Sequence, residues 1–473
     1  MVKNTSKHYD TIIVGAGPAG IFSAYELFKE NPKANILLIE QGKDIDKRSC
    51  PMLVKDISCI NCKPHCSIMT GWGGAGAYSD GKLTLTADYG GWLDEYLGGK
   101  KNVMEYIRYV DDIYLQFGGT EKTYGSYDEH VAEIERMAAT ADLKLIPAEI
   151  RHLGTENNFE ILSKMRAYLN DKITFLSLTQ VSSIITEAAP SGEATSVKGI
   201  ELANGEVLTA DYVIVAPGRV GSQWFRSECA RLGLELSNNQ VDIGVRVEVP
   251  ATSMEHITKH IYESKLVYYG KKFDDPIRTF CMNPYGEVVV ENTDGIMTVN
   301  GHSYASKRSN NTNFALLVSN NFTEPFKEPI AYGKYIATLA NMLGGTVIVQ
   351  RLGDLKRGRR STKQRMDRGL VQPTLTSATP GDLSLVLPYR QLTNIIEMLE
   401  ALDKVAPGVG SEHTLLYGVE VKFYSSRPQL STTLETNITN LFAIGDGAGV
   451  TRGLAQAGVS GVVVAREIAN RMK

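Results

Sequence analysis

The sequence predicts an α/β protein in which a parallel sheet is built from two distant parts of the chain and interrupted by an α+β domain. Strand-length apolar runs and a helical pattern alternate over residues 8–40, and a similar run returns at 441–444 before a final helical segment. Between them, residues 241–430 show short strands separated by polar loops, which is typical of a different unit. A strand–helix–strand pattern within about 30 residues indicates a βαβ unit and parallel pairing.

The expected elements follow from the periodicity of apolar residues. Residues 8–14 and 35–40 are apolar strands, and residues 19–29 between them have helical spacing. The turn Asn204-Gly205 indicates a meander that ends in a buried strand. Further helices are predicted at 102–117, 128–141, 157–170, 331–343 and 391–402, and further strands at 181–185, 197–202, 207–208, 212–216, 243–249 and 287–291. We therefore expect a first domain part at 1–240, an inserted domain at 241–430 and a completing part at 431–473.

Length and composition exclude several classes of protein. The chain has 473 residues, enough for two or three domains, and its 43% hydrophobic and 22% charged residues are globular values. With 50 Lys+Arg against 53 Asp+Glu, the net charge of −3 disfavours partners such as nucleic acid or an anionic membrane. No apolar run is long enough to span a bilayer, and the polar start is unlike a secretory signal. We expect a cytoplasmic protein that acts on a small-molecule substrate.

The strongest motif is the glycine-rich turn Gly15-Ala16-Gly17-Pro18-Ala19-Gly20, between the first strand and the first helix. In such a turn Gly15 permits the tight bend, Gly17 lets a pyrophosphate approach, and Gly20 permits close helix–strand packing. The helix N-terminus offers unpaired N–H groups to the phosphates. Glu40, 20 residues after Gly20, is placed to accept hydrogen bonds from ribose hydroxyls. The turn therefore predicts a dinucleotide site.

Two later motifs favour FAD over NAD as the dinucleotide. Residues 211–218 (Asp-Tyr-Val-Ile-Val-Ala-Pro-Gly) look like the strand and turn that cross under the nucleotide in flavoproteins with two dinucleotide domains. Residues 440–447 (Asn-Leu-Phe-Ala-Ile-Gly-Asp-Gly) resemble the second FAD motif, in which Asp446 would bind ribityl hydroxyls. Only one glycine fingerprint is present, so NAD(P)H is expected at most as a transient electron donor.

Nearly the whole chain, from about residue 8 to 470, is similar to the glutathione-reductase-type FAD superfamily. More specifically, it resembles a bacterial and archaeal family of FAD-dependent dehydrogenases, also described as NAD(P)/FAD-dependent oxidoreductases. The residues that carry this resemblance are 71–83 (Gly-Trp-Gly-Gly-Ala-Gly-Ala-Tyr-Ser-Asp-Gly-Lys-Leu), 380–384 (Pro-Gly-Asp-Leu-Ser) and 445–461. The resemblance implies a discontinuous Rossmann-type FAD-binding domain with bound FAD, and it implies no particular substrate.

The resemblance also implies which residues hold the cofactor. Residues 73–76 would lie against the flavin, and the helix that opens at 451–457 would point its positive end at the flavin N1/O2 edge, which stabilises reduced flavin. Val181 is at the place where such folds hold adenine through the backbone. The full expected set is Gly15, Gly17, Pro18, Ala19, Gly20, Glu40, Gln41, Arg48, Gly73, Gly74, Ala75, Gly76, Ser79, Lys82, Val181, Ala216, Gly218, Gly445, Asp446, Gly453, Leu454 and Ala455.

Four cysteines, Cys50, Cys59, Cys62 and Cys66, fall within 17 residues. Four thiolates at such spacing could bind zinc or an iron–sulfur cluster, with His65 as a substitute ligand. Alternatively, Cys59 and Cys62 could form a redox dithiol that exchanges electrons with the flavin, or the thiols could simply pack a loop beside the cofactor. The spacing matches no standard ferredoxin run, so these alternatives stay open.

Residues 351–368 contain eight Lys and Arg against two Asp. Such a run is usually a solvated face. Otherwise it could bind an acidic substrate, the extra phosphate of NADPH or RNA, although no aromatic residue lies within it to stack on bases.

The inserted domain is expected to supply the substrate groups. Glu420, Lys422 and Tyr424 alternate along one strand and so share a face, and Lys422 or Tyr424 could donate a proton opposite hydride transfer. An exposed strand face would give the same alternation. His302 is a further catalytic candidate, although its place after Asn300-Gly301 is also that of a turn histidine. The other candidate substrate groups are Arg246, Arg278, Cys281, Ser303, Tyr417 and Arg427.

Taken together, these features predict an FAD-dependent oxidoreductase that moves a hydride or an electron pair between flavin and a small, acidic molecule. Two alternatives come from other classes. One is an electron-relay protein in which flavin and a cysteine-held cluster serve a redox partner protein. The other is a flavin-dependent RNA-modifying enzyme.

Overall fold

The computed structural model describes residues 7–55, 60, 62–79, 81–188, 194–237, 241–293, 295–303, 308–320, 329–422 and 425–473. The chain divides into two compact units. The first contains Met1–Lys122, Arg151–Asn239 and Ser425–Lys473, and the second contains Thr123–Ile150 and Gln240–Tyr424. This division differs from the expected boundaries chiefly at 123–150. That segment joins the second unit because its strand β5 (Lys144–Ile146) pairs with β13 (Lys265–Tyr269) and its helix α5 (Glu129–Thr140) buries Val131, Ile134 and Ala138 in that unit's core.

The first unit is built on a mostly parallel sheet, as the sequence predicts. The strand order is β7-β2-β1-β10, and β22 also pairs with β10 in parallel. Strands β8 and β9 complete a meander by antiparallel pairing with the start of β10. The bounds are β1 His8–Val14, β2 Ile36–Ile39, β7 Thr174–Leu176, β8 Val181–Ala188, β9 Ala194–Leu202, β10 Val207–Val215 and β22 Leu441–Ala443. The pairing of β22 with β10 confirms that the C-terminal segment completes the sheet.

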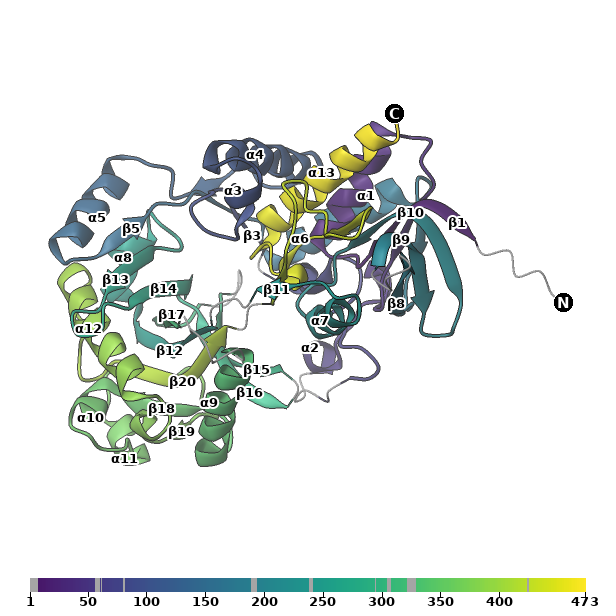
Figure 1. The fold of residues 1–473 in the computed structure, drawn as a ribbon. Helices are drawn as coiled ribbons and strands as arrows, with labels where there is room; N and C mark the ends of the chain where they lie inside the picture. The colour runs from purple at the N-terminus through teal and green to yellow at the C-terminus, as the bar shows by residue number, and fades with distance from the viewer. Residues whose placement is uncertain are drawn as a thin grey trace. The chain divides into compact units, whose positions relative to one another are not determined.

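Two long helices cover this sheet, α1 (Pro18–Glu30) and the C-terminal α13 (Leu454–Arg471). They lie side by side, purple and yellow in Figure 1, because glycine permits their close approach: a Cβ on Gly461 would lie 2.3 Å from the carbonyl oxygen of Ala19. Glu26 and Arg466 form an ion pair of 2.6 Å between the two helices. The other helices of the unit are α2 Pro51–Lys55, α3 Leu93–Tyr96, α4 Lys100–Gln116, α6 Thr155–Leu169 and α7 Ser222–Arg231, and two short strands are β3 Lys82–Thr84 and β6 Ile150–His152, whose first residue belongs to the second unit.

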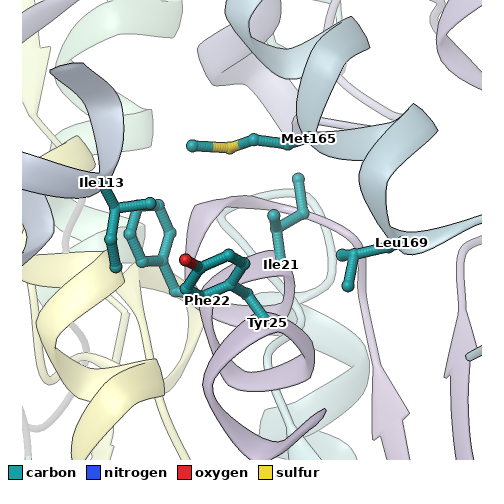
Figure 2. A pocket seen from close by; sticks show the side chains of 6 residues that line it. All are labelled: Ile21, Phe22, Tyr25, Ile113, Met165 and Leu169. Carbon is teal, nitrogen blue, oxygen red and sulfur yellow. The ribbon is translucent and has the colours of Figure 1, made fainter. Parts of the chain in front are cut away.

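The helices α1, α4 and α6 meet in an apolar layer (Figure 2). A small gap there is lined by Ile21, Phe22, Tyr25, Ile113, Met165 and Leu169. It has no room for a water molecule, so this layer is packed core and holds no ligand.

The second unit has an eight-stranded, mainly antiparallel sheet in the order β19-β18-β20-β12-β17-β14-β13-β5. Its central strand β12 pairs along its whole length with β17, and a separate hairpin is formed by β15 and β16. Its strands are β12 Val241–Pro250, β14 Pro276–Asn283, β15 Glu287–Thr293, β16 Ile296–His302, β17 Asn311–Asn320, β18 Ile348–Arg351, β19 Thr379–Pro380 and β20 Leu415–Lys422. Its remaining helices are α8 Ala251–Thr258, α9 Pro329–Gly344, α10 Leu352–Lys356, α11 Lys363–Asp367 and α12 Tyr389–Val405. Helices with a mainly antiparallel sheet make this unit α+β, as expected.

Among the described residues, no helix is both long and apolar enough to cross a membrane.

Candidate cofactor site

The glycine-rich turn links β1 to α1, and its three glycines meet different surroundings. A Cβ on Gly15, whose φ is +104°, would lie 2.1 Å from the carbonyl oxygen of Ala216, and one on Gly20 would lie 1.9 Å from that of Gly15. A Cβ on Gly17 would meet no atom within 4 Å. Gly17 is also the N-cap of α1 and makes no side-chain capping bond. Gly15 and Gly20 are therefore required by packing, whereas Gly17 leaves open space at a helix N-terminus, where a pyrophosphate fits.

A cavity of about 190 Å³ lies beside this turn, at the carboxyl ends of β1 and β2. It is large enough for an adenine or ribose group, and ligands of open parallel sheets bind at this edge. Four of the predicted cofactor residues, Gly15, Glu40, Gln41 and Val181, line it. The other lining residues are Val14, Ile39, Thr179, Gln180, Pro217, Val220, Gly221 and Trp224. No local motif marks Trp224, which reaches the cavity from α7 and donates its indole N–H to the Ser182 carbonyl oxygen at 2.9 Å.

The Glu40 carboxylate is buried and accepts three backbone hydrogen bonds. Its Oε2 accepts from Ala16 N at 2.9 Å, and its Oε1 accepts from Gly42 N at 2.8 Å and Gly71 N at 2.9 Å. A carboxylate offers about four lone-pair sites, so one remains for a ribose hydroxyl. Glu40 thus also holds three backbone N–H groups in place, a role that its position after β2 in the sequence does not predict.

The second FAD motif meets the turn after β10. Ile444 N donates to Val215 O at 3.0 Å, and a Cβ on Gly447 would lie 2.1 Å from Gly218 O. The Asp446 carboxylate accepts from Thr451 Oγ1 at 2.8 Å and from the N–H of Gly453, the N-cap of α13, at 3.3 Å. Burial raises the pKa of Asp446, while nearby positive charge and these hydrogen bonds oppose the shift. Asp446 therefore lies at the positive end of α13.

The glycines expected to face the flavin are placed between the glycine-rich turn and α13. Gly73 N donates to Ala16 O at 2.7 Å, and a Cβ on Gly74 would lie 3.2 Å from the Cα of Gly17. A Cβ on Gly76 would lie 2.7 Å from the side chain of Leu454. We call residues 73–76 the flavin loop. The structure brings the flavin loop, the turn and the start of α13 together.

The remaining predicted cofactor residues fall around this junction. Ser79 Oγ donates to Gly76 O at 2.7 Å, and Lys82 is the first residue of β3. Ala19 lies 3.1 Å from where a Cβ on Gly445 would be, and Ala455 is buried in the first turn of α13. Among these residues are therefore groups that fit all parts of an FAD: open space for the pyrophosphate, a cavity for adenosine and a glycine loop for the ring.

The cysteine-rich segment is described only in part. Cys50 is buried, Cys62 is partly buried and Cys66 is exposed, while Cys59 lies outside the described residues. Of the described residues, only His8, Asp10 and Asp211 bring three ligating atoms within 4.8 Å of one another. Cys50, Cys62 and Cys66 are thus not gathered into a ligand set by themselves, and the metal or cluster stays a prediction.

In the second unit, a charged group is buried where β12 meets β20. Arg246 Nε lies 3.0 Å from Glu420 Oε2, and both side chains are 0% exposed. Lys422 Nζ lies 3.1 Å from Glu420 Oε1 and 3.9 Å from Glu291 Oε2. These contacts confirm that Glu420 and Lys422 share a strand face, whereas Tyr424 lies outside the described residues. Burial lowers the pKa of Lys422, but the two carboxylates outweigh it and the net shift is upward.

The other candidate substrate groups are held by neighbours. Arg246 Nη1 also donates to Cys281 O at 2.7 Å, and Arg278 pairs with Asp242 at 2.5 Å. The Tyr417 hydroxyl donates to Glu248 at 2.5 Å. Ser303 Oγ donates to Asn283 at 3.4 Å, and His302 is exposed at the end of β16. Within the second unit, Arg246 and Cys281 therefore accompany Glu420 and Lys422. Ser303 reaches this group through Asn283, whose amide donates to Cys281 O at 2.9 Å, while Arg278 and Tyr417 have other carboxylate partners.

Arg427 belongs to the first unit and not to the inserted domain, where the sequence places it. It donates to Glu95 Oε2 at 2.8 Å, and its guanidinium lies 5.2 Å from the centre of the Trp92 ring. The reason is that β21 (Arg427–Pro428) pairs with β11 (Leu236–Ser237), which draws residue 427 to the first unit.

The basic run 351–368 is largely ion-paired at its surface. Lys356 pairs with Glu400 at 2.9 Å, Arg357 with Glu412 at 2.5 Å and Arg359 with the buried Asp354 at 2.8 Å. These pairs favour the solvated face over an anion-binding surface.

Comparison with known proteins places this geometry in a class. Residues 240–423 match the family described as FAD-dependent protein, C-terminal domain-like, and these bounds nearly coincide with the larger segment of the second unit, Gln240–Tyr424. A protein of Clostridium beijerinckii, itself described as uncharacterized, is 28% identical over 97% of this chain and 80% of its own length. With the glycine-rich turn of the first unit, the family match makes the chain similar to FAD-dependent proteins.

Several solved structures align over almost all of the chain at low similarity. Formate oxidase from Aspergillus oryzae RIB40 aligns with a TM-score of 0.45 and 13% identity over 99% of both chains. Glycine oxidase from Geobacillus kaustophilus aligns with a TM-score of 0.39 and 13% identity over 98% of this chain and 95% of its own. The FrdA subunit of E. coli quinol fumarate reductase aligns with a TM-score of 0.40 and 15% identity over 98% of this chain and 70% of its own.

Proposed function

We propose that the protein transfers a hydride or an electron pair between FAD and a small polar substrate that the second unit binds. The observation that carries this proposal is the buried group Arg246–Glu420–Lys422, in the unit that matches the FAD-dependent C-terminal domain. Bound FAD would supply a ring that accepts and returns the electron pair. Gly17 and the N-terminus of α1 would hold its pyrophosphate, and Asp446 would accept hydrogen bonds from its ribityl hydroxyls.

The energetics of the charged group support a role in chemistry. Burying ions costs several kcal/mol for each ion, and a well-packed apolar replacement is often as stable or more stable (roughly 1–4 kcal/mol). Arg246 and Glu420 are nevertheless 0% exposed, and the hydrogen bonds of the Arg246 guanidinium are directed at Cys281 O and Asn300 Oδ1. Buried, paired ionisable groups of this kind cluster at functional sites.

Lys422 is the residue of this group best placed to meet a substrate. Its side chain is 14% exposed, whereas those of Arg246 and Glu420 are fully buried. Glu420 and Glu291 raise the pKa of Lys422 against the effect of burial, so its Nζ keeps a proton and a positive charge at neutral pH. A permanently protonated ammonium would bind an anionic or carbonyl oxygen and stabilise negative charge on it, so organic acids are the first substrates to screen.

The test is anaerobic turnover. Flavin reduced by NADH, NADPH or dithionite is mixed with a panel of organic acids, and reoxidation is followed at the flavin absorbance. We expect one class to reoxidise the flavin, with a rate at least about tenfold lower in Lys422→Met. Lys404→Met, at an exposed lysine of α12 in the same unit, is the matched control and should leave the rate unchanged. Equal rates for Lys422→Met and the wild-type protein would exclude the proposed role of Lys422.

A further inference from the structure

The segment that leads into the flavin loop is held by two buried side chains of opposite charge. On one side, Glu40 accepts the N–H of Gly71 at 2.9 Å, together with the N–H groups of Ala16 and Gly42. The side chain therefore joins the glycine-rich turn to the entry of the flavin loop. Gly71 itself has a φ of +112°, a conformation that L side chains rarely adopt.

On the other side, Arg48 donates to three carbonyl groups of the same segment. Its Nε donates to Ser67 O at 2.9 Å, its Nη2 to Ile68 O at 2.8 Å and its Nη1 to Trp72 O at 2.5 Å. Arg48 is 5% exposed, and its guanidinium lies 5.0 Å from the centre of the Tyr78 ring. The Tyr78 hydroxyl returns a hydrogen bond to Arg48 O at 3.0 Å.

Arg48 forms no ion pair with a carboxylate of the described residues, although it is buried. Burial lowers the pKa of Arg48 to about 10, while the nearby Glu40 carboxylate opposes that shift. An arginine placed only to stabilise the fold would be expected to have a direct carboxylate partner. Here each of the three nitrogens of the planar guanidinium donates to a different carbonyl group, an arrangement that a lysine ammonium cannot reproduce.

We propose that Glu40 and Arg48 together position the flavin loop for the isoalloxazine end of FAD. They act as positioning residues: Glu40 fixes the N–H of Gly71, and Arg48 fixes the carbonyl groups on either side of it. Gly73 N donates a hydrogen bond to Ala16 O, and Gly73 directly follows the segment that Glu40 and Arg48 hold. The position of the flavin loop therefore depends on the position of this segment. This inference rests on the proposed function only in that residues 73–76 face the flavin ring.

The proposal predicts different effects at the adenosine end and at the flavin end of the cofactor. Arg48 donates hydrogen bonds to the segment that leads to the flavin loop and to none of the residues that line the adenosine cavity. Glu40 contacts both the turn and Gly71, and it lines the cavity. Loss of Arg48 should therefore disturb the flavin ring alone, whereas loss of Glu40 should disturb both ends.

The experiment compares holoprotein carrying Arg48→Lys or Glu40→Gln with wild-type protein. The readouts are the visible circular dichroism of the bound flavin, the rate of FAD release and the affinity for ADP, which lacks the flavin ring. Arg48→Lys should change the dichroism and speed FAD release at least about tenfold, the size of effect expected from one lost charge-assisted hydrogen bond. Its ADP affinity should stay within about threefold of wild type. Glu40→Gln should change the same dichroism band and also lower the affinity for ADP, because an amide cannot accept hydrogen bonds from all three N–H groups.

Arg151→Lys is the matched control. Arg151 is a buried arginine of the first unit that pairs with Asp111 at 2.6 Å and donates to Thr120 O at 2.5 Å. It should leave the flavin dichroism unchanged even if it lowers the melting temperature. Unchanged dichroism and FAD release in Arg48→Lys would overturn the proposal. Equal losses of FAD and ADP affinity in Arg48→Lys would also overturn it, because Arg48 would then support the whole domain. Wild-type protein without any FAD would instead refute the proposed function.

Discussion

The carbonyl oxygen of Gly218 lies 2.1 Å from where a Cβ on Gly447 would be, so the turn after β10 and the turn after β22 meet backbone to backbone. These residues are separated by more than 200 positions in the sequence, and only the parallel pairing of β22 with β10 brings them together. The contact joins the two halves of the cofactor site within the first unit. It also explains why residue 447 is a glycine, although its φ does not lie in the left-handed region that favours glycine.

The glycines of the β1–α1 turn should divide into two functional groups. Gly20→Ala should destabilise the fold, because its Cβ would lie 1.9 Å from Gly15 O. Gly17→Val should leave the melting temperature of the apoprotein within about 2 °C of wild type, because the space beside Gly17 is open. The same substitution should lower the affinity for FAD more than about tenfold. Thermal unfolding and FAD titration of both variants measure this. Tight FAD binding by Gly17→Val would show that the pyrophosphate lies elsewhere.

Trp224 should contribute to the affinity for the adenosine half of FAD. Its ring lines the cavity of about 190 Å³ and is fixed by the hydrogen bond to Ser182 O. Stacking of a base on an aromatic ring is worth about 1–3 kcal/mol, so Trp224→Ala should weaken both FAD and ADP by roughly 5- to 150-fold. Trp224→Phe keeps a stacking surface and should lose less. If Trp224→Ala binds ADP as tightly as wild type does, adenine does not stack on this ring.

The buried Asp446 carboxylate should destabilise the apoprotein at neutral pH. Burial raises its folded pKa above the unfolded value of about 3.8, so the folded state binds the proton more tightly. The cost of the buried charge is therefore full above the folded pKa and disappears as pH falls toward the unfolded value. Asp446→Asn should raise the melting temperature at pH 7 relative to wild type, and the difference should shrink near pH 4.

The same substitution tests the cofactor role of this carboxylate. The asparagine side chain is a weaker acceptor than a carboxylate for the ribityl hydroxyls, so FAD affinity should fall while stability rises. A stability gain that does not shrink on acidification would contradict the raised pKa of Asp446.

How far the sequence leads can be judged from particular elements. The first strand is confirmed at His8–Val14, and the first helix extends the expected 19–29 by one residue at each end, because the glycine-rich turn and the apolar spacing determine them locally. Strand β10 runs unbroken over Val207–Val215, where the sequence separates 207–208 from 212–216. The polar Thr209 and Asp211 interrupt the apolar run and hid this continuity, although the neighbouring Leu208, Ala210 and Val213 are buried.

The relationships that involve distant residues could not be predicted. The pairing of β5 with β13 moves residues 123–150 into the second unit, and no local pattern marks it. Glu40 was predicted as a ribose acceptor from its spacing, but its bond to Gly71 depends on how a long glycine-rich segment folds back. Likewise, the alternation of Glu420 and Lys422 predicted a shared face, whereas the burial of Arg246 against Glu420 needed the pairing of β12 with β20.

Removal of Glu420 should be more damaging than removal of the whole ion pair. Glu420→Gln leaves Arg246 buried without its carboxylate, which should cost about 3–5 kcal/mol of unfolding free energy. The double variant Arg246→Met, Glu420→Leu removes both charges and should recover much of that loss. Urea unfolding of the single variants Arg246→Met and Glu420→Leu and of the double variant gives the coupling energy. Additive losses would mean that Arg246 and Glu420 do not depend on one another.

The central claim is that this chain carries FAD and cycles it between oxidation states. The most direct measurement is an absorbance spectrum of anaerobically purified protein before and after dithionite, with FAD, iron and zinc quantified on the same sample. The account predicts flavin bands at roughly 370 and 450 nm that bleach on reduction, with one FAD released per chain. Stoichiometric iron in addition would assign a cluster to the cysteine-rich segment and favour electron relay. Protein that folds yet neither contains nor takes up FAD would contradict the account.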